Sequence, residues 1–361
     1  MKLVTNIKQK INEWSAGVVM LCTENKYNQT QAGLISAIKQ SVISHPQYNS
    51  ICTLIDQNSS NLVSSTNNTE VNANIFDAIT TIAVMHILAI YRLSPLIGIQ
   101  PMSKPTNLSY LSHASIDNNS DTGLKLEVDS FSMVAKTRPF NVEVGRELSH
   151  NNTASFAYHS ELVNRVSLQL CREQYREIFN DIMTATPNKS TIDLTHGGTL
   201  TADLVVAHIC DASKKIAVQS NRGPANIVVM DHTTYDLSIR HHSNFVESVD
   251  AHNKSTLTFV GTLHETINVY TTDMLASPPP DDKMQVIIVG YKGDTETDTG
   301  YIIGPYIPIG VSGIVFNQQT FIPMMNLYSR YGNSSTGNKD TFTDGSYYAA
   351  IYIKSIITEE Q

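Results

Sequence analysis

Side chains capable of metal binding or catalysis stand close together at a few places in the sequence. The stretch His208-Ile209-Cys210-Asp211 holds three that could bind a metal ion. Residues two positions apart do not share a face of a helix, so these side chains diverge if the segment is helical. We interpret Cys210 as a small buried apolar residue and predict no metal site here.

Two histidine-containing pairs are the next candidates, Asp231-His232 and His241-His242. A carboxylate beside a histidine is a common arrangement in hydrolytic sites. Neither pair lies in a nucleophile-elbow or zinc-protease pattern, and histidine pairs in loops are usually solvated. A hydrolase that uses Asp231, His232 and a serine stays open as the alternative from the enzyme class.

A glycine-rich segment, Gly290-Tyr291-Lys292-Gly293, superficially resembles a phosphate-binding loop. It leads into the acidic run 294–298, which would repel phosphate. The sequence contains neither a GxxxxGK[ST] loop nor a GxGxxG fingerprint. We therefore interpret the segment as a turn and predict no catalytic, cofactor-binding or metal-binding residue.

Composition narrows the class of protein further. The chain has 361 residues, 41% of them hydrophobic and 16% charged, which suffices for a substantial core. Its net charge of −8 argues against an electrostatic nucleic-acid binder. The four cysteines form no CxxC pair, which suits a reducing compartment. The most apolar run, 75–91, is interrupted by polar residues and is too short for a membrane span, so we expect a soluble protein without a membrane partner.

Hydrophobic periodicity predicts the elements that would position any site. Apolar residues repeat at helical spacing over 153–184 and 202–220, and we expect Gly223 to end the second helix with a positive φ. Two strand-like runs, 106–114 and 124–129, flank the turn cluster 117–123 and predict a long hairpin. Further strands are predicted at 226–230, 284–289, 301–303 and 347–354. The fold class is therefore α+β.

The first 74 residues are polar, with two short helical patterns at 7–14 and 31–44. Isolated short helices are unstable in water, so we expect this arm to dock on subunits of the same protein, with Trp14 buried. Residues 58–74 would form an extended connection.

Several segments, in the same order, resemble the major capsid proteins of T-even (T4-like) tailed phages. They are Leu96–Pro105, Val134–Pro139, Val144–Leu148, Ile216–Val229, Val289–Gly293, Asp298–Gly300, Gly304–Tyr306, Phe321–Pro323, Arg330–Gly332 and Tyr347–Lys354.

This resemblance implies the HK97-type phage capsid fold, with an N-terminal arm, an extended hairpin loop, a peripheral domain with a long spine helix, and an axial domain. The expected divisions are an arm at 1–74, a helix and lead-in at 75–103, the extended loop at 104–138, the peripheral domain at 139–224 and 323–361 with its spine helix at 153–184, and the axial domain at 225–322.

Two departures from the family pattern are visible. Larger T-even relatives carry an extra domain inserted in the extended-loop region, whereas here only the turn cluster 117–123 separates the hairpin strands. Those relatives also lose an N-terminal segment to a protease that cuts after Ile-x-Glu or Leu-x-Glu. The early match here, Ile11-Asn12-Glu13, lies far upstream of the expected cut.

The function implied is that of a shell protein and not an enzyme: the major capsid protein of a tailed bacteriophage, forming hexameric capsomers and an icosahedral shell around the packaged DNA. Other copies of the chain, the vertex, portal and scaffolding proteins, and non-specific proximity to double-stranded DNA are the expected partners, and no cofactor is expected. The protein would be assembled in the bacterial host cytoplasm and reside in the virion capsid.

Residues expected to serve structure or assembly come from the hairpin and from the family-like segments. They are Leu124, Leu126, Val128, Arg222, Gly223, Gly290, Tyr291, Gly293, Arg330, Tyr331 and Gly332. We expect the hairpin to leave its own subunit and to bury its three apolar residues on a neighbour. A pentamer-forming vertex paralogue and a cellular nanocompartment shell are the alternatives with the same fold.

Overall fold

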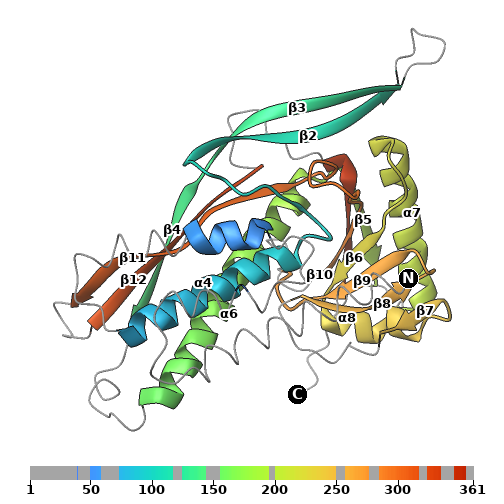
Figure 1. Cartoon of the computed structure of the whole chain (residues 1–361). Coiled ribbons are helices and arrows are strands. Elements are labelled where there is room, and N and C mark those ends of the chain that lie inside the picture. Colours follow the sequence, from blue (N-terminus) through green and yellow to red (C-terminus); the bar gives the residue numbers. More distant parts are fainter. Residues whose placement is uncertain are drawn as a thin grey trace, which may run out of the picture.

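The computed structural model describes residues 39, 49–57, 73–116, 124–143, 155–194, 200–248, 257–275, 284–316, 323–334 and 345–354. Figure 1 shows a body of helices and two sheets from which a long hairpin projects. The α+β class predicted from the sequence is confirmed.

Helices carry the long apolar patterns. The spine helix α6 spans Ser155–Ala185 and confirms the predicted 153–184, while α4 spans Ala73–Arg92 and crosses it (Figure 1). The Tyr175 hydroxyl of α6 donates to the Ala89 carbonyl of α4 at 2.6 Å. Helix α7 spans Ala202–Ser220, as predicted, and α8 spans His232–Leu237. There are also two short 3-10 turns, η1 (Ile239–His241) and η2 (Gly345–Tyr347), and residues 49–57 of the N-terminal part are helical.

A seven-stranded sheet has the order β5-β13-β10-β6-β9-β8-β7. Its strands are β5 (Asn188–Asp193), β6 (Ile227–Met230), β7 (Phe245–Glu247), β8 (Thr258–Leu263), β9 (Ile267–Thr271), β10 (Met284–Gly290) and β13 (Tyr348–Lys354). All residues of β6 are buried, which explains why this strand reads as a continuous apolar run in the sequence. One face packs against α7 through Val205, Ile209 and Ile216.

A four-stranded sheet has the order β1-β11-β12-β4. Its strands are β1 (Gly98–Ile99), β4 (Lys136–Glu143), β11 (Ile302–Phe316) and β12 (Pro323–Asn333). The hairpin forms a separate two-stranded ribbon of β2 (Thr106–Ile116) and β3 (Leu124–Val134), paired in register from Thr106↔Val134 to Ile116↔Leu124. The predicted hairpin is confirmed, and its strands run further than the sequence indicated.

Sheet membership does not follow the expected division into peripheral and axial segments. Strands β5 and β13 come from the ranges assigned to the peripheral domain, yet they lie in the sheet that holds the axial strands β6 to β10. Strand β11 begins in the axial range and pairs with β12 in the four-stranded sheet. The domain boundaries themselves stay a prediction.

The N-terminal arm is described only at residue 39 and at 49–57. Within it, Ile51, Leu54 and Ile55 are buried in the main core together with residues of α4 and α6. The arm thus docks, in its described part, on its own subunit. The stripe at Trp14 and residues 58–72 of the expected connection 58–74 lie outside the described residues, whereas its last two residues are not extended because α4 begins at Ala73.

Candidate assembly surface and its anchors

The hairpin β2–β3 has two chemically different faces near its base. Odd-numbered residues Leu111, Phe131 and Met133 are buried and pack with Met102 and Ile302 in one cluster. The expectation that the hairpin leaves its own subunit is therefore wrong for its base. Apolar burial holds this part of the ribbon to the four-stranded sheet.

The opposite face exposes large apolar side chains. Leu108, Tyr110, Val128 and Val134 are 54%, 45%, 58% and 44% exposed. The register pairs Leu108 with Ser132 and Val134 with Thr106, so these even-numbered positions share one face of the ribbon. Leu124 and Leu126 occupy strand positions of the same parity as Val128, but their side chains lie outside the described residues. A row of exposed apolar residues along a projecting ribbon is a surface suited to docking.

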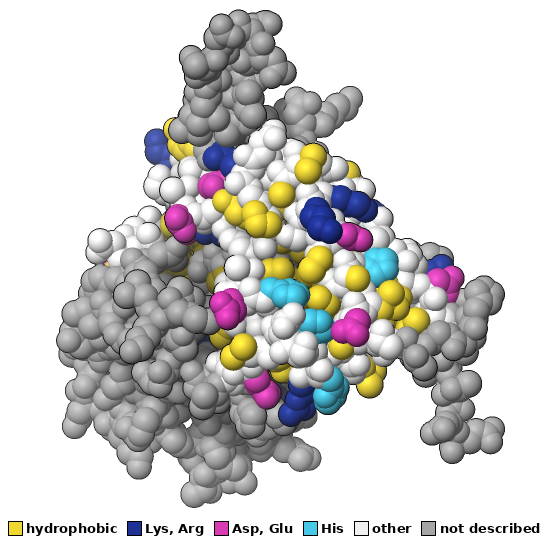
Figure 2. Space-filling view, turned by 90° about the vertical axis from the view of Figure 1, so that its right-hand side faces the viewer, with side chains coloured by type: hydrophobic (Ala, Val, Ile, Leu, Met, Phe, Trp, Pro, Cys, Tyr) yellow, Lys and Arg dark blue, Asp and Glu magenta, His cyan; other side chains and the backbone are white. Residues whose placement is uncertain are grey.

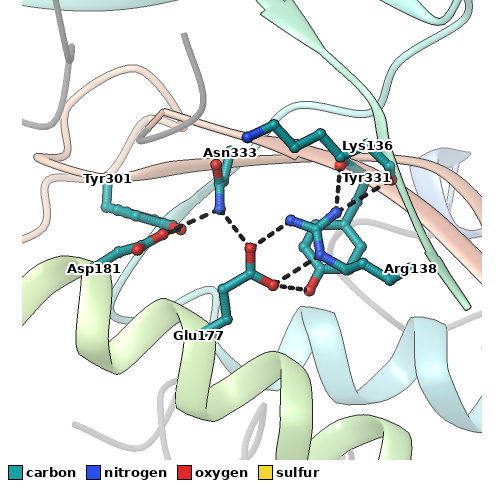
Figure 3. Close-up of polar contacts among 7 residues, drawn as sticks. All are labelled: Lys136, Arg138, Glu177, Asp181, Tyr301, Tyr331 and Asn333. Atoms are coloured by element: carbon teal, nitrogen blue, oxygen red, sulfur yellow. Dashed lines mark hydrogen bonds and ion pairs between the residues drawn. The ribbon is translucent and has the colours of Figure 1, made fainter. Parts of the chain in front are cut away.

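A polar cluster anchors the strand that leaves the hairpin to the spine helix (Figure 3). The Arg138 guanidinium of β4 donates from Nε to Glu177 Oε2 at 2.8 Å and from Nη2 to Glu177 Oε1 at 2.5 Å. Its Nη1 donates to the carbonyls of Tyr331 and Lys136 at 2.9 and 3.2 Å. The same guanidinium lies 3.5 Å from the centroid of the Tyr331 ring. Arginine suits this role because its rigid fork matches a carboxylate and its plane stacks on an aromatic ring.

Strands β11 and β12 join the same cluster. The Tyr331 hydroxyl donates to Glu177, and the Asn333 amide donates to Glu177 Oε1 at 3.2 Å and to Asp181 Oδ2 at 3.1 Å. Tyr301, just before β11, donates its hydroxyl to Asp181 Oδ2 at 2.8 Å. One turn of α6 thus holds β4, β12 and the start of β11, as Figure 3 shows.

Electrostatics favours the charged forms of Glu177 and Arg138. Burial by itself would raise the pKa of Glu177, but hydrogen bonds from Arg138, Tyr331 and Asn333 outweigh it and hold that pKa below its usual value. Burial would lower the pKa of Arg138, and its bonds to Glu177 outweigh that effect and raise it. The Arg138–Glu177 pair is therefore ionised at neutral pH and works as a structural clamp.

Two paired glycines make room for the hairpin on the four-stranded sheet. Gly304 of β11 and Gly332 of β12 are register partners. A Cβ at Gly332 would lie 2.4 Å from Met133 Cγ, and one at Gly304 would lie 2.6 Å from Met133 Sδ. Gly332 was expected from the sequence to serve structure. Because it has no side chain, Met133 of β3 can pack directly against β12 at this position.

Arg222 meets the loop between β10 and β11. Its Nε lies 3.4 Å from Asp298 Oδ1, to which Tyr347 also donates its hydroxyl at 3.3 Å. A Cβ at Gly293 would lie 1.9 Å from Asp298 Oδ2, so a side chain there would displace Asp298 from its contact with Arg222. Arg222 and Gly293, both predicted to serve structure, belong to one junction.

Gly290 and Tyr291 connect the same junction to the seven-stranded sheet. The Gly290 carbonyl accepts from Asn226 N at 3.1 Å, and Tyr291 N donates to the Tyr347 carbonyl at 3.0 Å. The Tyr291 ring contacts the backbone of Gly223, where a Cβ would find its nearest atom at 3.4 Å. These contacts position the loop without presenting a reactive group.

The predicted positive φ at Gly223 is wrong. Helix α7 ends instead at Asn221, whose φ of 52° and ψ of 27° are left-handed. Asparagine tolerates this conformation better than other non-glycine residues, so it serves as the helix stop two residues earlier.

Arg330, also selected from the sequence, contacts a backbone carbonyl and an aromatic ring. Its Nη2 lies 3.5 Å from the Ala135 carbonyl, directly after the hairpin, and its guanidinium lies 5.4 Å from the Tyr306 ring centroid. With Arg138 and Met133 it forms part of the hairpin base.

The structure shows what surrounds the residues that were considered for catalysis and metal binding. Asp231 caps α8, because its Oδ2 accepts from Thr233 N at 3.1 Å. His208 and Asp211 of α7 line a cavity of about 150 Å³ beside β5. In the described ranges, no group of three or more His, Cys, Asp or Glu side chains could hold a metal ion. None of the helices in that part of the chain is both long and apolar enough to cross a membrane.

The molecular face that includes α7, α8 and β7 also exposes apolar side chains, among them Val218, Leu237 and Val246. Figure 2 shows that apolar groups on this side are interspersed with charged and histidine side chains. The even-numbered positions of the hairpin strands, by contrast, hold only apolar residues, tyrosine, serine and threonine, so that face of the ribbon has no charged residue.

Glu177 and Asp181 are functional residues that sequence reasoning missed. Two acidic residues at i and i+4 repel each other on an isolated helix, which is a signal that something else binds them. Their partners lie 39 to 156 residues away in the chain, so no local pattern could identify those partners.

Comparison with known proteins identifies related families and structures. The model of the family described as "Major capsid protein Gp23" matches residues 112–353, about two thirds of the chain. A comparison with curated proteins found no match.

Among solved structures, the capsid of the cyanophage P-SCSP1u is similar at 10% identity with a TM-score of 0.44, covering 73% of this chain and 88% of its own. The capsid of Ralstonia phage GP4 has 7% identity and a TM-score of 0.45, covering 71% and 86%. The SrpI encapsulin of Synechococcus elongatus PCC 7942 has 11% identity and a TM-score of 0.42, covering 72% and 86%.

Proposed function

The chain belongs to the major capsid protein Gp23 family, and from this premise we propose how its copies join into a shell. It is a major capsid protein of a bacteriophage, a structural protein of the virion capsid that assembles with copies of itself. Its spine helix, projecting hairpin and sheet-rich part are the elements of the HK97-type fold that the resemblance implies.

The hairpin is the element through which one subunit holds the next. Its exposed even-numbered face carries Leu108, Tyr110, Val128 and Val134, and burying such side chains contributes about 25 cal/mol per Å² of apolar surface. Strands of 11 residues reach roughly 35 Å, enough to extend over a neighbouring subunit. The odd-numbered face of the base stays on its own subunit, so the docking surface is the even-numbered face, which continues outward along the ribbon to the positions of Leu126 and Leu124.

The assembled state is a hexameric capsomer within an icosahedral shell around packaged DNA. A net charge of −8 fits a container that does not bind its genome tightly, because like charges repel. Vertex, portal and scaffolding proteins are the further partners, and assembly takes place in the host cytoplasm. The chain acts without catalysis.

Replacing apolar residues of the exposed face tests this function. Leu108→Ser combined with Val128→Ser removes two side chains that are 54% and 58% exposed, so the monomer keeps its fold. We expect circular dichroism and the urea midpoint to stay unchanged while shell formation, followed by negative-stain microscopy and sedimentation, falls at least tenfold.

Val218→Ser is the matched control, because Val218 is 76% exposed and belongs to α7 and not to the hairpin. Normal shells from the double variant, or an equal loss from the control, would contradict the docking role of the hairpin. Copy number per virion separates the hexamer-forming subunit from a pentamer-forming vertex paralogue, since vertices hold far fewer subunits.

A further inference from the structure

The side-chain amide of Gln100, which directly follows β1, hydrogen-bonds to the main chain of β2 in the way that a neighbouring strand would. Tyr110 N of β2 donates to Gln100 Oε1 at 3.0 Å, and Gln100 Nε2 donates to the Tyr110 carbonyl at 2.8 Å. Both main-chain groups of Tyr110 are thus bonded to one side chain.

The orientation of Tyr110 in the ribbon explains this arrangement. Tyr110 lies opposite Ser130, and residues along an antiparallel pair alternate between bonding their partner and pointing away from it. The main-chain groups of Tyr110 point away from β3, to the open edge of β2. An open edge is normally solvated, and here Gln100 occupies it.

Gln100 also contacts the loop that joins the two large sheets. Its Nε2 lies 3.2 Å from the Glu296 carbonyl, while the Glu296 carboxylate accepts from Ile99 N at 2.7 Å. Lys292 Nζ, whose side chain is 8% exposed, lies 3.5 Å from Glu296 Oε1. Gln100 therefore connects β2 to the segment between β10 and β11.

We infer that Gln100 is a positioning residue that sets the direction of the hairpin relative to the seven-stranded sheet. Arg138 and Met133 hold the side of the ribbon formed by β3 and β4. On β2, Leu111 adds an apolar contact, which is non-directional and leaves the ribbon free to rotate, whereas the paired hydrogen bonds between Gln100 and Tyr110 are directional and remove that freedom. The inference rests on the proposed function, because hairpin direction matters only if the hairpin docks on another copy.

Residue-resolved hydrogen exchange on the unassembled full chain measures the bridge. In Gln100→Ala the Tyr110 amide loses its acceptor, so we expect it to exchange about tenfold faster. The amides of Ser109 and Leu111, neighbours of opposite orientation in the ribbon, should keep their rates. Gln100→Glu keeps the acceptor for Tyr110 N and should retain part of the protection.

Gln219→Ala is the matched control. Gln219 makes a comparable reciprocal amide pair with Asn188, at 2.6 and 3.1 Å, and this pair joins α7 to β5 and not to the hairpin. It should leave Tyr110 exchange and shell formation unchanged.

Shell formation supplies the second readout, in which Gln100→Ala should give fewer closed shells and a broader size distribution. Unchanged Tyr110 exchange would overturn the bridge whatever the shells look like. Faster exchange with normal shells would overturn the positioning role. Failure of the hairpin docking model appears separately, as normal shells from the Leu108→Ser, Val128→Ser variant.

Discussion

The clamp between β4 and the spine helix makes a quantitative prediction. Arg138→Met removes the guanidinium and keeps an apolar stem, Glu177→Gln removes the charge and keeps the shape, and the double variant closes a thermodynamic cycle. Each variant leaves the rest of the cluster, including Tyr331 and Asn333, in place.

The magnitude follows from the contacts and their exposure. Arg138 donates two hydrogen bonds to Glu177 and two to backbone carbonyls. The two side chains are 24% and 32% exposed, so solvent screens them more than a fully buried pair. Exposed pairs contribute about 0.2–1 kcal/mol, and breaking buried ones costs about 3–5 kcal/mol. We therefore expect Arg138→Met to lower the unfolding free energy by about 2 kcal/mol, with a coupling energy of about 1–1.5 kcal/mol.

Acidity provides an independent check with a defined sign. The folded-state pKa of Glu177 lies below its ordinary value of 4.5. Its contribution to stability is therefore complete above pH 4.5 and is lost as the pH falls through the lower folded-state value. The coupling energy should shrink in the same range.

Urea denaturation of the unassembled variants, followed by circular dichroism at pH 7 and at successive values below 4.5, measures both quantities. A coupling energy under about 0.3 kcal/mol at pH 7 would refute the clamp, since independent sites deviate by that much. A coupling energy that persists unchanged at low pH would refute the assignment of charge to Glu177.

Two further stability predictions concern packing and buried charge. Gly332→Ala places a Cβ 2.4 Å from Met133 Cγ and should lower the free energy of unfolding, measured by urea denaturation, by about 1–3 kcal/mol. Gly223→Ala is the control, because a Cβ there has its nearest atom at 3.4 Å and should lower that free energy much less. Equal losses in the two variants would contradict the packing argument. Burial lowers the pKa of His86 from 6.5 to about 4, although a hydrogen bond to Gln174 opposes this shift. The free energy of unfolding should therefore fall by about 3 kcal/mol as the pH drops from 6.5 toward 4. His86→Leu should remove this slope, and an identical slope in both proteins would show that another group titrates.

Local sequence patterns predicted the elements well because their cause is local. The 3.6-residue repeat of Val166, Leu170, Ile178 and Ile182 marks the spine helix, and all four side chains are buried. Alternation and a turn cluster likewise predicted the hairpin, whose strands pair in register. Hydrophobic periodicity acts within a few turns or residues, so it is visible without knowledge of the partner.

Neighbours in space were not predictable from the same patterns. Nothing local indicates that β13, near the C-terminus, lies between β5 and β10, or that Asn221 and not Gly223 adopts the left-handed conformation that ends α7. The first depends on which strand edges remain free when the sheet forms, and the second on how the chain must turn to meet the next strand.

The family, the α+β class, the spine helix and the hairpin could all be inferred from the sequence, because ordered motifs and apolar periodicity are properties of neighbouring residues. The contacts of Arg138 with Glu177 and of Gln100 with Tyr110, and the burial of one face of the hairpin base on its own subunit, became visible only in the folded chain. These contacts depend on side chains that the fold brings together from distant positions. The energy of these contacts depends on how far the groups are desolvated and how they are oriented, and both depend on segments that are distant in the sequence.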